Sequence, residues 1–134
     1  MKVDANISAD MTKTGRQAAH LESLGYDGLR IAELNHDPFL PLAIAAEHTN
    51  KVELLTSVAV AFARNPMSMA TLAHDLNAFS QGRMILGLGS QVRPHIERRF
   101  SMPWYKAARQ MREFIAAMNA IFDSWYAGER LEYI

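Results

Sequence analysis

The chain has 134 residues, of which 49% are hydrophobic, so it can fold as one ordinary domain with its own core. Its 14 basic and 14 acidic residues cancel, so charge gives no argument for a nucleic-acid or membrane partner, and we expect neither. The lack of cysteine excludes disulfides, thiolate metal sites and cysteine catalysis. With neither a signal peptide nor the ~20-residue apolar run of a membrane helix, we expect a cytoplasmic protein.

Short apolar runs alternate with longer helical patterns in the first half of the chain. Residues 2–7 are a strand candidate, and residues 11–24 are predicted to form a helix behind several capping side chains. Residues 26–33 are predicted as the second strand. A second helix is expected to begin near Asp37-Pro38, because proline is tolerated in the first turn of a helix.

The second half repeats this alternation. The run "VELLTSVAVAF", residues 52–62, is typical of a strand that is covered on both faces. Asn65-Pro66 predicts the start of a third helix, and "RMILGLG", residues 83–89, is the fourth predicted strand. We expect the charged segment 90–104 to be a loop. Apolar side chains spaced three or four apart over residues 108–125 predict the last helix.

The resulting order is βαβαβαβα, which predicts an α/β fold of four βα units with parallel strands. These units account for almost the whole chain, so we expect a single domain over residues 1–134.

The fourth strand runs directly into a glycine turn, "GLGSQ". A dinucleotide-binding fingerprint needs a third glycine and an immediate helix, but Val92 occupies the third position and a charged segment with Pro94 follows. A pair of glycines that only packs backbone is one alternative. In a parallel barrel, Ser90 and Gln91 would instead lie at the carboxyl-terminal face, where ligands bind.

The segment "AELNHDPF" places polar side chains just after the second strand, at the functional end of a parallel sheet. A histidine beside a carboxylate could perform acid–base chemistry, because imidazole titrates near neutral pH. From spacing alone, we favour the alternative in which Asp37 caps a helix and His36 is solvated. We expect no metal site, because Glu33 and His36 have no evident third ligand.

Two polar residues, Thr56 and Ser57, interrupt the apolar third strand. Buried hydroxyls need hydrogen-bond partners, so we favour bonds to the neighbouring backbone. The alternative is a bulge that places backbone against a flat ligand.

A local basic cluster follows the fourth strand and could attract an anionic ligand or cofactor tail. Ion pairs on a solvated helix surface explain such a run equally well. The cluster comprises Arg93, His95, Arg98, Arg99, Lys106, Arg109 and Arg112.

Taken together, these stretches resemble the luciferase-like monooxygenase family, and within it the oxidoreductases that use the deazaflavin coenzyme F-420. The matching stretches are "GYDGLRIAE", "HDPFLPLAIAAEHT", "LLTSVAVAFARNPMSMATLAHDLNAFSQGRMILGLGSQV", "PHIERRFSMPW" and "MREFIAAMNAIF". They cover nearly the entire chain, in the family's order and at its distances.

The resemblance implies a (β/α)8 TIM barrel that moves a hydride between F-420, or flavin mononucleotide (FMN) as second choice, and a small organic substrate. It also implies a non-proline cis peptide after the third strand's polar pair, for which Ser57-Val58 is our candidate. Ser57, Val58 and Ala59 would then back the cofactor ring. Gly89 would allow close approach of backbone, and Ser90 would hydrogen-bond the ring or substrate.

The resemblance further implies that Glu33 and His36 handle protons. Some relatives carry glutamate where this chain has Gln91, which can orient a group but cannot transfer a proton at ordinary pH. A full barrel needs about 250 residues. We therefore expect the N-terminal half of a barrel, which either pairs with a missing C-terminal half or forms a homo-oligomer. The alternative function is a non-catalytic half-barrel that self-associates.

Overall fold

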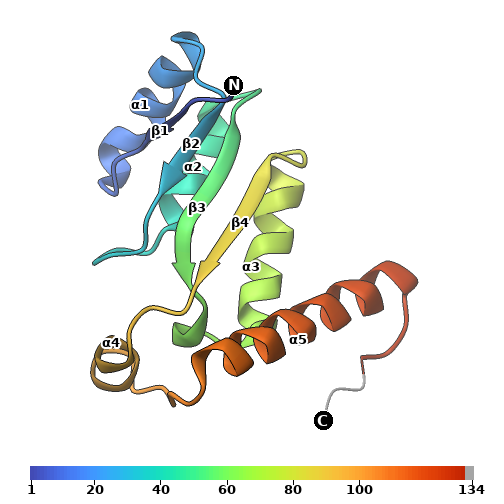
Figure 1. The fold of residues 1–134 in the computed structure, drawn as a ribbon. Helices are drawn as coiled ribbons and strands as arrows, with labels where there is room; N and C mark the ends of the chain where they lie inside the picture. Colours follow the sequence, from blue (N-terminus) through green and yellow to red (C-terminus); the bar gives the residue numbers. More distant parts are fainter. Residues whose placement is uncertain (132–134) are drawn as a thin grey trace. The chain divides into compact units, whose positions relative to one another are not determined.

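Four parallel strands form one sheet in the order β1-β2-β3-β4 in the computed structural model, which describes residues 1–131 (Figure 1). This confirms the predicted α/β fold of successive βα units. The elements in chain order are β1 (Asp4–Asn6), α1 (Met11–Ser23), β2 (Gly28–Ile31), α2 (Phe39–His48), β3 (Glu53–Val60), a 3-10 helix η1 (Ala61–Ala63), α3 (Pro66–Phe79), β4 (Met84–Gly89), α4 (Arg93–Arg98) and α5 (Ala107–Ala127).

Two predictions from the sequence were wrong in detail. The third strand ends at Val60, and the next three residues form a 3-10 helix, which an apolar run cannot distinguish from strand. The segment 90–104, predicted as a loop, contains α4. Because Ile96 is its one buried side chain, this short helix has no apolar period that the sequence could reveal.

The described chain divides into two compact units. The first comprises residues 1–59 and 73–88, and the second comprises residues 60–72 and the chain from Gly89 onward. Helix α3 contributes residues to both units, and each unit is described by itself below.

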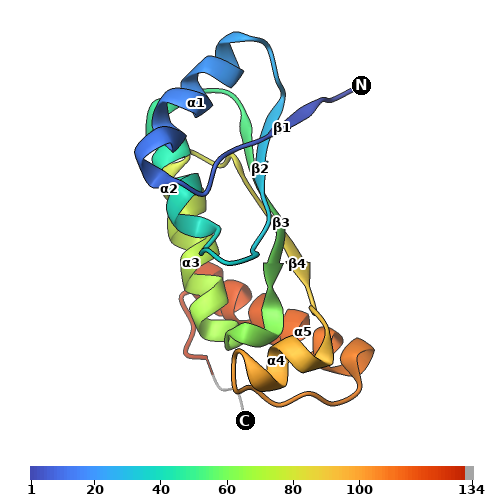
Figure 2. The same ribbon diagram turned by 90° about the vertical axis from the view of Figure 1, so that its left-hand side faces the viewer.

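In the first unit, α1 and α2 lie on the same side of the strands (Figure 2). Leu29 of β2 pairs in register with Leu54 of β3, and both side chains are fully buried toward the helices. The next register position carries Asn6, Arg30 and Leu55, whose side chains point to the opposite face because successive side chains alternate along a strand. That face of the unit therefore bears polar and charged groups.

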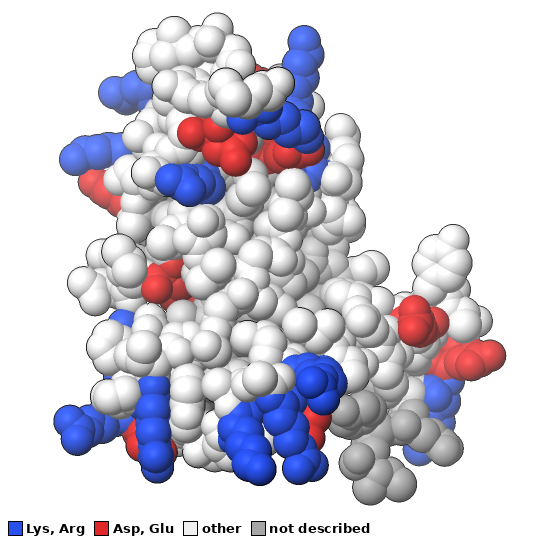
Figure 3. Space-filling model, viewed as in Figure 1, with Lys and Arg blue, Asp and Glu red and all other residues white. Residues whose placement is uncertain are grey.

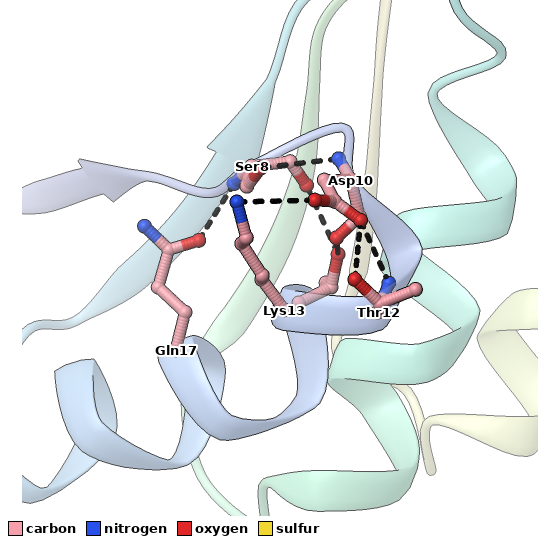
Figure 4. A network of polar contacts seen from close by, with 6 residues as sticks. Ser8, Asp10, Thr12, Lys13 and Gln17 are labelled. Carbon is pink, nitrogen blue, oxygen red and sulfur yellow. Dashed lines mark hydrogen bonds and ion pairs between the residues drawn. The ribbon is translucent and has the colours of Figure 1, made fainter.

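Helix α1 begins with a capped first turn (Figure 4). The Asp10 carboxylate accepts hydrogen bonds from the Thr12 backbone N–H at 3.0 Å and the Thr12 hydroxyl at 2.6 Å. The Ser8 backbone N–H donates to Gln17 Oε1 at 2.7 Å, which ties the preceding loop to the second turn. The Asp10 carboxylate thereby satisfies the Thr12 N–H, one of the amide groups that a helix start leaves without an intrahelical partner.

Gly15 allows α1 and α2 to approach closely. A Cβ atom at this position would lie 2.8 Å from the ring of His48, which itself bonds the Ile44 carbonyl through Nδ1 at 2.9 Å. The glycine therefore has a packing role, although glycine in a helix interior costs about 1 kcal/mol relative to alanine.

Arg83, at the start of β4, ties three elements of the first unit together. Its Nε donates to the Ser80 carbonyl at 2.8 Å, beyond the end of α3. Nη1 donates to Thr49 Oγ1 at 2.8 Å and the Val52 carbonyl at 3.1 Å. Nη2 donates to the carbonyls of Ala46 at 3.0 Å and Thr49 at 3.1 Å. All five donors of the guanidinium group are thus used, and its charge lies at the carboxyl-terminal end of α2, where a cation is favourable.

Arg83 binds backbone carbonyls, and Glu22 binds backbone N–H groups in the loop before β3. Its carboxylate accepts hydrogen bonds from the backbone N–H groups of Asn50, Lys51 and Val52 at 2.8–3.0 Å. Burial raises the pKa of this carboxyl group, but the three backbone donors, helped by the positive charge of Arg83, outweigh burial and leave the pKa below its usual value.

We predict that Arg83→Lys lowers the free energy of unfolding by about 2–3 kcal/mol, because a lysine ammonium cannot replace five planar donors and leaves buried carbonyls without partners. Urea denaturation would measure the loss. Arg16→Lys, on the exposed surface of α1, is the matched control and should change stability by less than about 0.5 kcal/mol. Equal effects of the two substitutions would contradict the prediction.

We predict that Glu22→Gln destabilises the protein at neutral pH, with a difference from wild type that shrinks in acid. A carboxyl group whose folded pKa lies below its ordinary 4.5 stabilises the fold above that pH. This contribution is lost as the pH falls through the folded pKa. Urea denaturation from pH 7 down to about pH 3 would measure the difference. Glu47→Gln, on the exposed surface of α2, is the control. A difference for Glu22→Gln that does not vary with pH would refute the assignment.

Candidate functional site

A cleft of about 360 Å³ opens in the first unit at the carboxyl ends of β1 and β2. In parallel α/β proteins this end of the sheet binds ligands. The cleft mixes apolar side chains with amide, guanidinium and imidazole groups. Its lining residues are Asn6, Ile7, Ala9, Arg30, Ile31, Ala32, Leu34, Asn35 and His36.

The wall of the cleft formed by β1 and β2 is held by two bonds between these strands. Arg30 Nε donates to Asn6 Oδ1 at 2.9 Å, and the Ile7 backbone N–H donates to the Arg30 carbonyl at 3.0 Å. The arginine and the amide are therefore oriented before any ligand arrives. Neither residue was singled out from the sequence. A polar side chain in each of two short strands, in "DANI" and "GLRI", was the signal that could have identified them.

The loop after β2 separates the two predicted proton-handling residues. His36 is exposed and lines the cleft, whereas Glu33 is 8% exposed and is not part of the lining. The backbone N–H of Glu33 donates to the Val58 carbonyl at 3.1 Å, so this loop is attached to the carboxyl-terminal half of β3. The structure thus gives His36 direct access to the cleft and places Glu33 at the junction with β3.

Asp37 caps α2. Its Oδ1 accepts hydrogen bonds from the backbone N–H groups of Phe39 at 2.7 Å and Leu40 at 3.1 Å. The interpretation of Asp37 as a capping residue beside an exposed His36 is confirmed.

The peptide bond between Ser57 and Val58 is cis, as predicted. Ser57 is exposed, Val58 is 42% exposed, and Ala59 is fully buried. The segment proposed to back a cofactor ring therefore presents two side chains outward and anchors the third in the core. Its role toward a ring stays a prediction.

Thr56 and Gly87 join β3 to β4 just before this segment. Thr56 Oγ1 donates to the Gly87 carbonyl and accepts from the Gly87 N–H, both at 2.9 Å. The prediction that the Thr56 hydroxyl bonds to neighbouring backbone is therefore confirmed. A Cβ atom at Gly87 would lie only 2.2 Å from the Thr56 carbonyl oxygen, so the first glycine of the turn is needed for strand packing.

Gly89, Ser90 and Gln91 belong to the second unit and are described within it. Ser90 Oγ donates to the Gln91 carbonyl at 3.1 Å, and Gln91 Oε1 accepts from the Val92 N–H at 3.0 Å. Gln91 has a positive φ of 60°, so it forms a tight turn before α4. The predicted contacts of these residues with a ring or substrate stay predictions.

The basic cluster lies in the second unit, where Lys and Arg side chains gather over α4 and the start of α5 (Figure 3). Arg93 pairs with Glu97 at 2.9 Å, and Arg109 pairs with Glu113 at 2.8 Å, each one helical turn apart. The guanidinium of Arg99 lies 4.9 Å from the ring centre of Phe100. Ion pairs on a helix surface therefore account for part of this cluster.

Within residues 1–131, no group of three or more histidine, cysteine, aspartate or glutamate side chains is arranged to hold a metal ion. None of the helices in this part of the chain is long and apolar enough to cross a membrane.

The sequence profile of the luciferase-like monooxygenases matches residues 2–133, and the chain belongs to this family. An uncharacterised protein of Mycobacterium tuberculosis is 54% identical over 131 residues, which are 98% of this chain and 38% of that protein. The chain thus spans well under half the length of this curated relative.

Solved structures extend the comparison at the level of the fold. The FMN complex of the oxygenating constituent of 3,6-diketocamphane monooxygenase from Pseudomonas putida is 20% identical, with a TM-score of 0.80 over 90% of this chain and 40% of its own. The coenzyme F420 dependent tetrahydromethanopterin reductase of Methanopyrus kandleri is 22% identical, with a TM-score of 0.63 over 78% of this chain and 30% of its own. The predicted fold class, four βα units of a luciferase-like barrel, is confirmed.

Proposed function

We propose that the chain supplies the cofactor-facing half of a luciferase-like oxidoreductase, which transfers a hydride between a deazaflavin or flavin and a small organic substrate. The observation that carries the proposal is the juxtaposition in the first unit of the cleft with the exposed Ser57-Val58 segment. The Glu33–Val58 backbone bond links these two features. F-420 is the first choice of cofactor and FMN the second. Family membership, together with structural relatives of both cofactor types, supports a deazaflavin or flavin as the cofactor.

The residues at this end of the sheet fit a flat ring with an apolar face and a polar rim. Val58 offers an exposed apolar side chain at the end of β3. The Ser57 hydroxyl, the Asn35 amide and the His36 imidazole can hydrogen-bond a polar rim. When bound, the deazaflavin or flavin supplies the hydride chemistry itself.

The chain's own residues would position, shield and exchange protons. His36 lines the cleft, where its imidazole can act as a proton donor or acceptor at a substrate oxygen. Glu33 would hold the loop that carries His36 against β3 and assist this proton transfer. Gly89 would let backbone approach the ring, while Ser90 and Gln91 would orient the ring or substrate without transferring protons.

We also propose that residues 1–134 belong to one domain, which further strands complete. The sheet is open, with β1 and β4 at its edges, and four strands are too few to close a barrel. Edge strands offer unpaired backbone groups that a partner can pair with. The additional strands come from either a C-terminal half or a second copy of the chain. If no cofactor binds, self-association is the second candidate function.

We predict that the purified chain binds F-420 saturably and FMN more weakly, as measured by fluorescence titration. Val58→Asp should weaken F-420 binding about tenfold or more, because it places a charge against the apolar ring face. Val92→Asp introduces the same charge at another exposed valine, in the second unit, and serves as the control. Binding of neither cofactor by the wild-type chain would refute the proposed cofactor site.

We predict that the chain is larger than its 15.0 kDa monomer mass in solution, because the open strand edges favour a second copy. Size-exclusion chromatography with light scattering at about 10–100 µM would measure the mass, since assembly depends on protomer concentration. A cooperatively folded monomer throughout this range would contradict self-association.

A further inference from the structure

A second hollow lies wholly within the second unit and has a different chemical character from the cleft. It is a pocket of about 290 Å³, and aromatic, proline and aliphatic side chains dominate its walls. These walls include Phe62, Pro66, Met102, Pro103, Phe114 and Ala117. They come from η1, the start of α3, the loop before α5, and α5 itself.

The walls of this pocket are fixed. Phe62, Phe114 and Ala117 are 2%, 7% and 3% exposed, so the core of the unit holds these side chains. Trp104 packs edge-on against Phe62, with ring centres 5.6 Å apart. Gln110 Nε2 donates to the Pro103 carbonyl at 3.1 Å, which fastens the loop to α5. The pocket is therefore preformed rather than a gap under a loose loop.

The polar groups at its rim, which include Arg64, are already engaged in hydrogen bonds, and Arg64 Nη1 donates to the Val60 carbonyl at 3.4 Å. The Tyr105 hydroxyl donates to Glu113 Oε2 at 2.7 Å, and Arg109 Nε donates to Glu113 Oε1 at 2.8 Å. The hydrogen bond from Tyr105, followed by that from Arg109, holds the pKa of the Glu113 carboxyl below its usual value. Asn65 Oδ1 accepts from the Ser68 N–H at 2.8 Å. The negative charge of Glu113 is therefore already paired with Arg109 and is not available to a charged ligand.

We propose that this pocket binds a small neutral molecule with a single aromatic or alicyclic ring. Its volume of about 290 Å³ lies just below the roughly 300–1,000 Å³ typical of ligand sites, which suits a single ring better than a larger ligand. Its apolar walls supply the binding energy, and its compensated rim disfavours an ionic group, which would lose water without gaining a partner. The inference does not depend on the proposed cofactor site, because every wall residue lies in the second unit.

The test uses three probes with one carbon skeleton: benzyl alcohol, benzoate and benzylamine. The chain has two tryptophans, so Trp125→Phe leaves Trp104, beside the pocket wall, as the only fluorescent indole. Benzyl alcohol should change Trp104 emission saturably. Benzoate and benzylamine should bind about tenfold more weakly or worse, because both are ionised at neutral pH.

A second experiment fills the pocket. Ala117→Leu, made in the same Trp125→Phe background, places a larger side chain in the space and should weaken benzyl alcohol binding about tenfold or more. Ala116→Leu makes the same change at the adjacent, exposed position of α5 and should leave binding unaltered. Circular dichroism would verify that both variants keep their helices.

Three outcomes would overturn the proposal: no saturable response to benzyl alcohol, equal affinity for the ionic probes, or equal binding by the Ala117→Leu and Ala116→Leu variants. Should Ala117→Leu fail to fold, the probe series in the Trp125→Phe protein still decides the question. F-420 titration of the same protein is a separate measurement, so failure of this pocket and failure of the cofactor site can be distinguished.

Discussion

The five hydrogen bonds of the Arg83 guanidinium are the constraint on which the first unit depends. They fix the end of α2, the start of β3 and the chain that leaves α3 around a single charged group. Glu22 closes the same region from the other side by accepting three backbone N–H groups of the loop before β3. Because β3 and β4 both begin here, their relative register is set at the amino ends of the strands. The positions of their carboxyl ends follow from that register.

The Thr56–Gly87 bonds maintain the register of β3 and β4 toward the carboxyl ends of the strands, where ligands bind in parallel α/β folds. The Thr56 hydroxyl bridges to β4 at both Gly87 backbone groups, directly before the Ser57-Val58 segment turns outward. The Val58 carbonyl then receives the Glu33 N–H, so the loop with His36 is fixed to the same strand. The Thr56–Gly87 and Glu33–Val58 bonds thus connect the Arg83 network at the amino ends of the strands to the candidate site at their carboxyl ends. The elements that stabilise the sheet and those that would bind a ligand are separate, as in other parallel α/β folds.

The sequence predicted the features that local patterns determine. Continuous apolar runs identified β3 and β4, and "NHDPF" and "RNP" marked the starts of α2 and α3 because capping and proline geometry are local properties. Helix α4 was missed because one buried isoleucine makes no periodic pattern. The role of Gly87 could not be foreseen, because its necessity comes from the Thr56 carbonyl, 31 residues away. Asn6 and Arg30 were missed for the same reason: each looks like a solvated side chain until the strand register pairs them.

The Arg30–Asn6 pair also sets the chemical character of the uncovered face of the sheet. A sheet face that normally packs against an apolar partner carries apolar side chains. When the partner is absent, those side chains are exposed and the protein tends to aggregate. Here β2 instead points the guanidinium group of Arg30 toward the uncovered face, and Lys2 and Glu53 form an ion pair near the amino ends of β1 and β3. Exposed charges of this kind reduce the apolar area of the uncovered face, which opposes non-specific association. If further strands cover this face, as proposed, the guanidinium group of Arg30 would favour a polar partner face or a polar ligand over a purely apolar one, because its remaining N–H donors would otherwise lose their water. In the proposed half-barrel, the same arginine would therefore restrict both the ligand that the cleft accepts and the strands that complete the sheet.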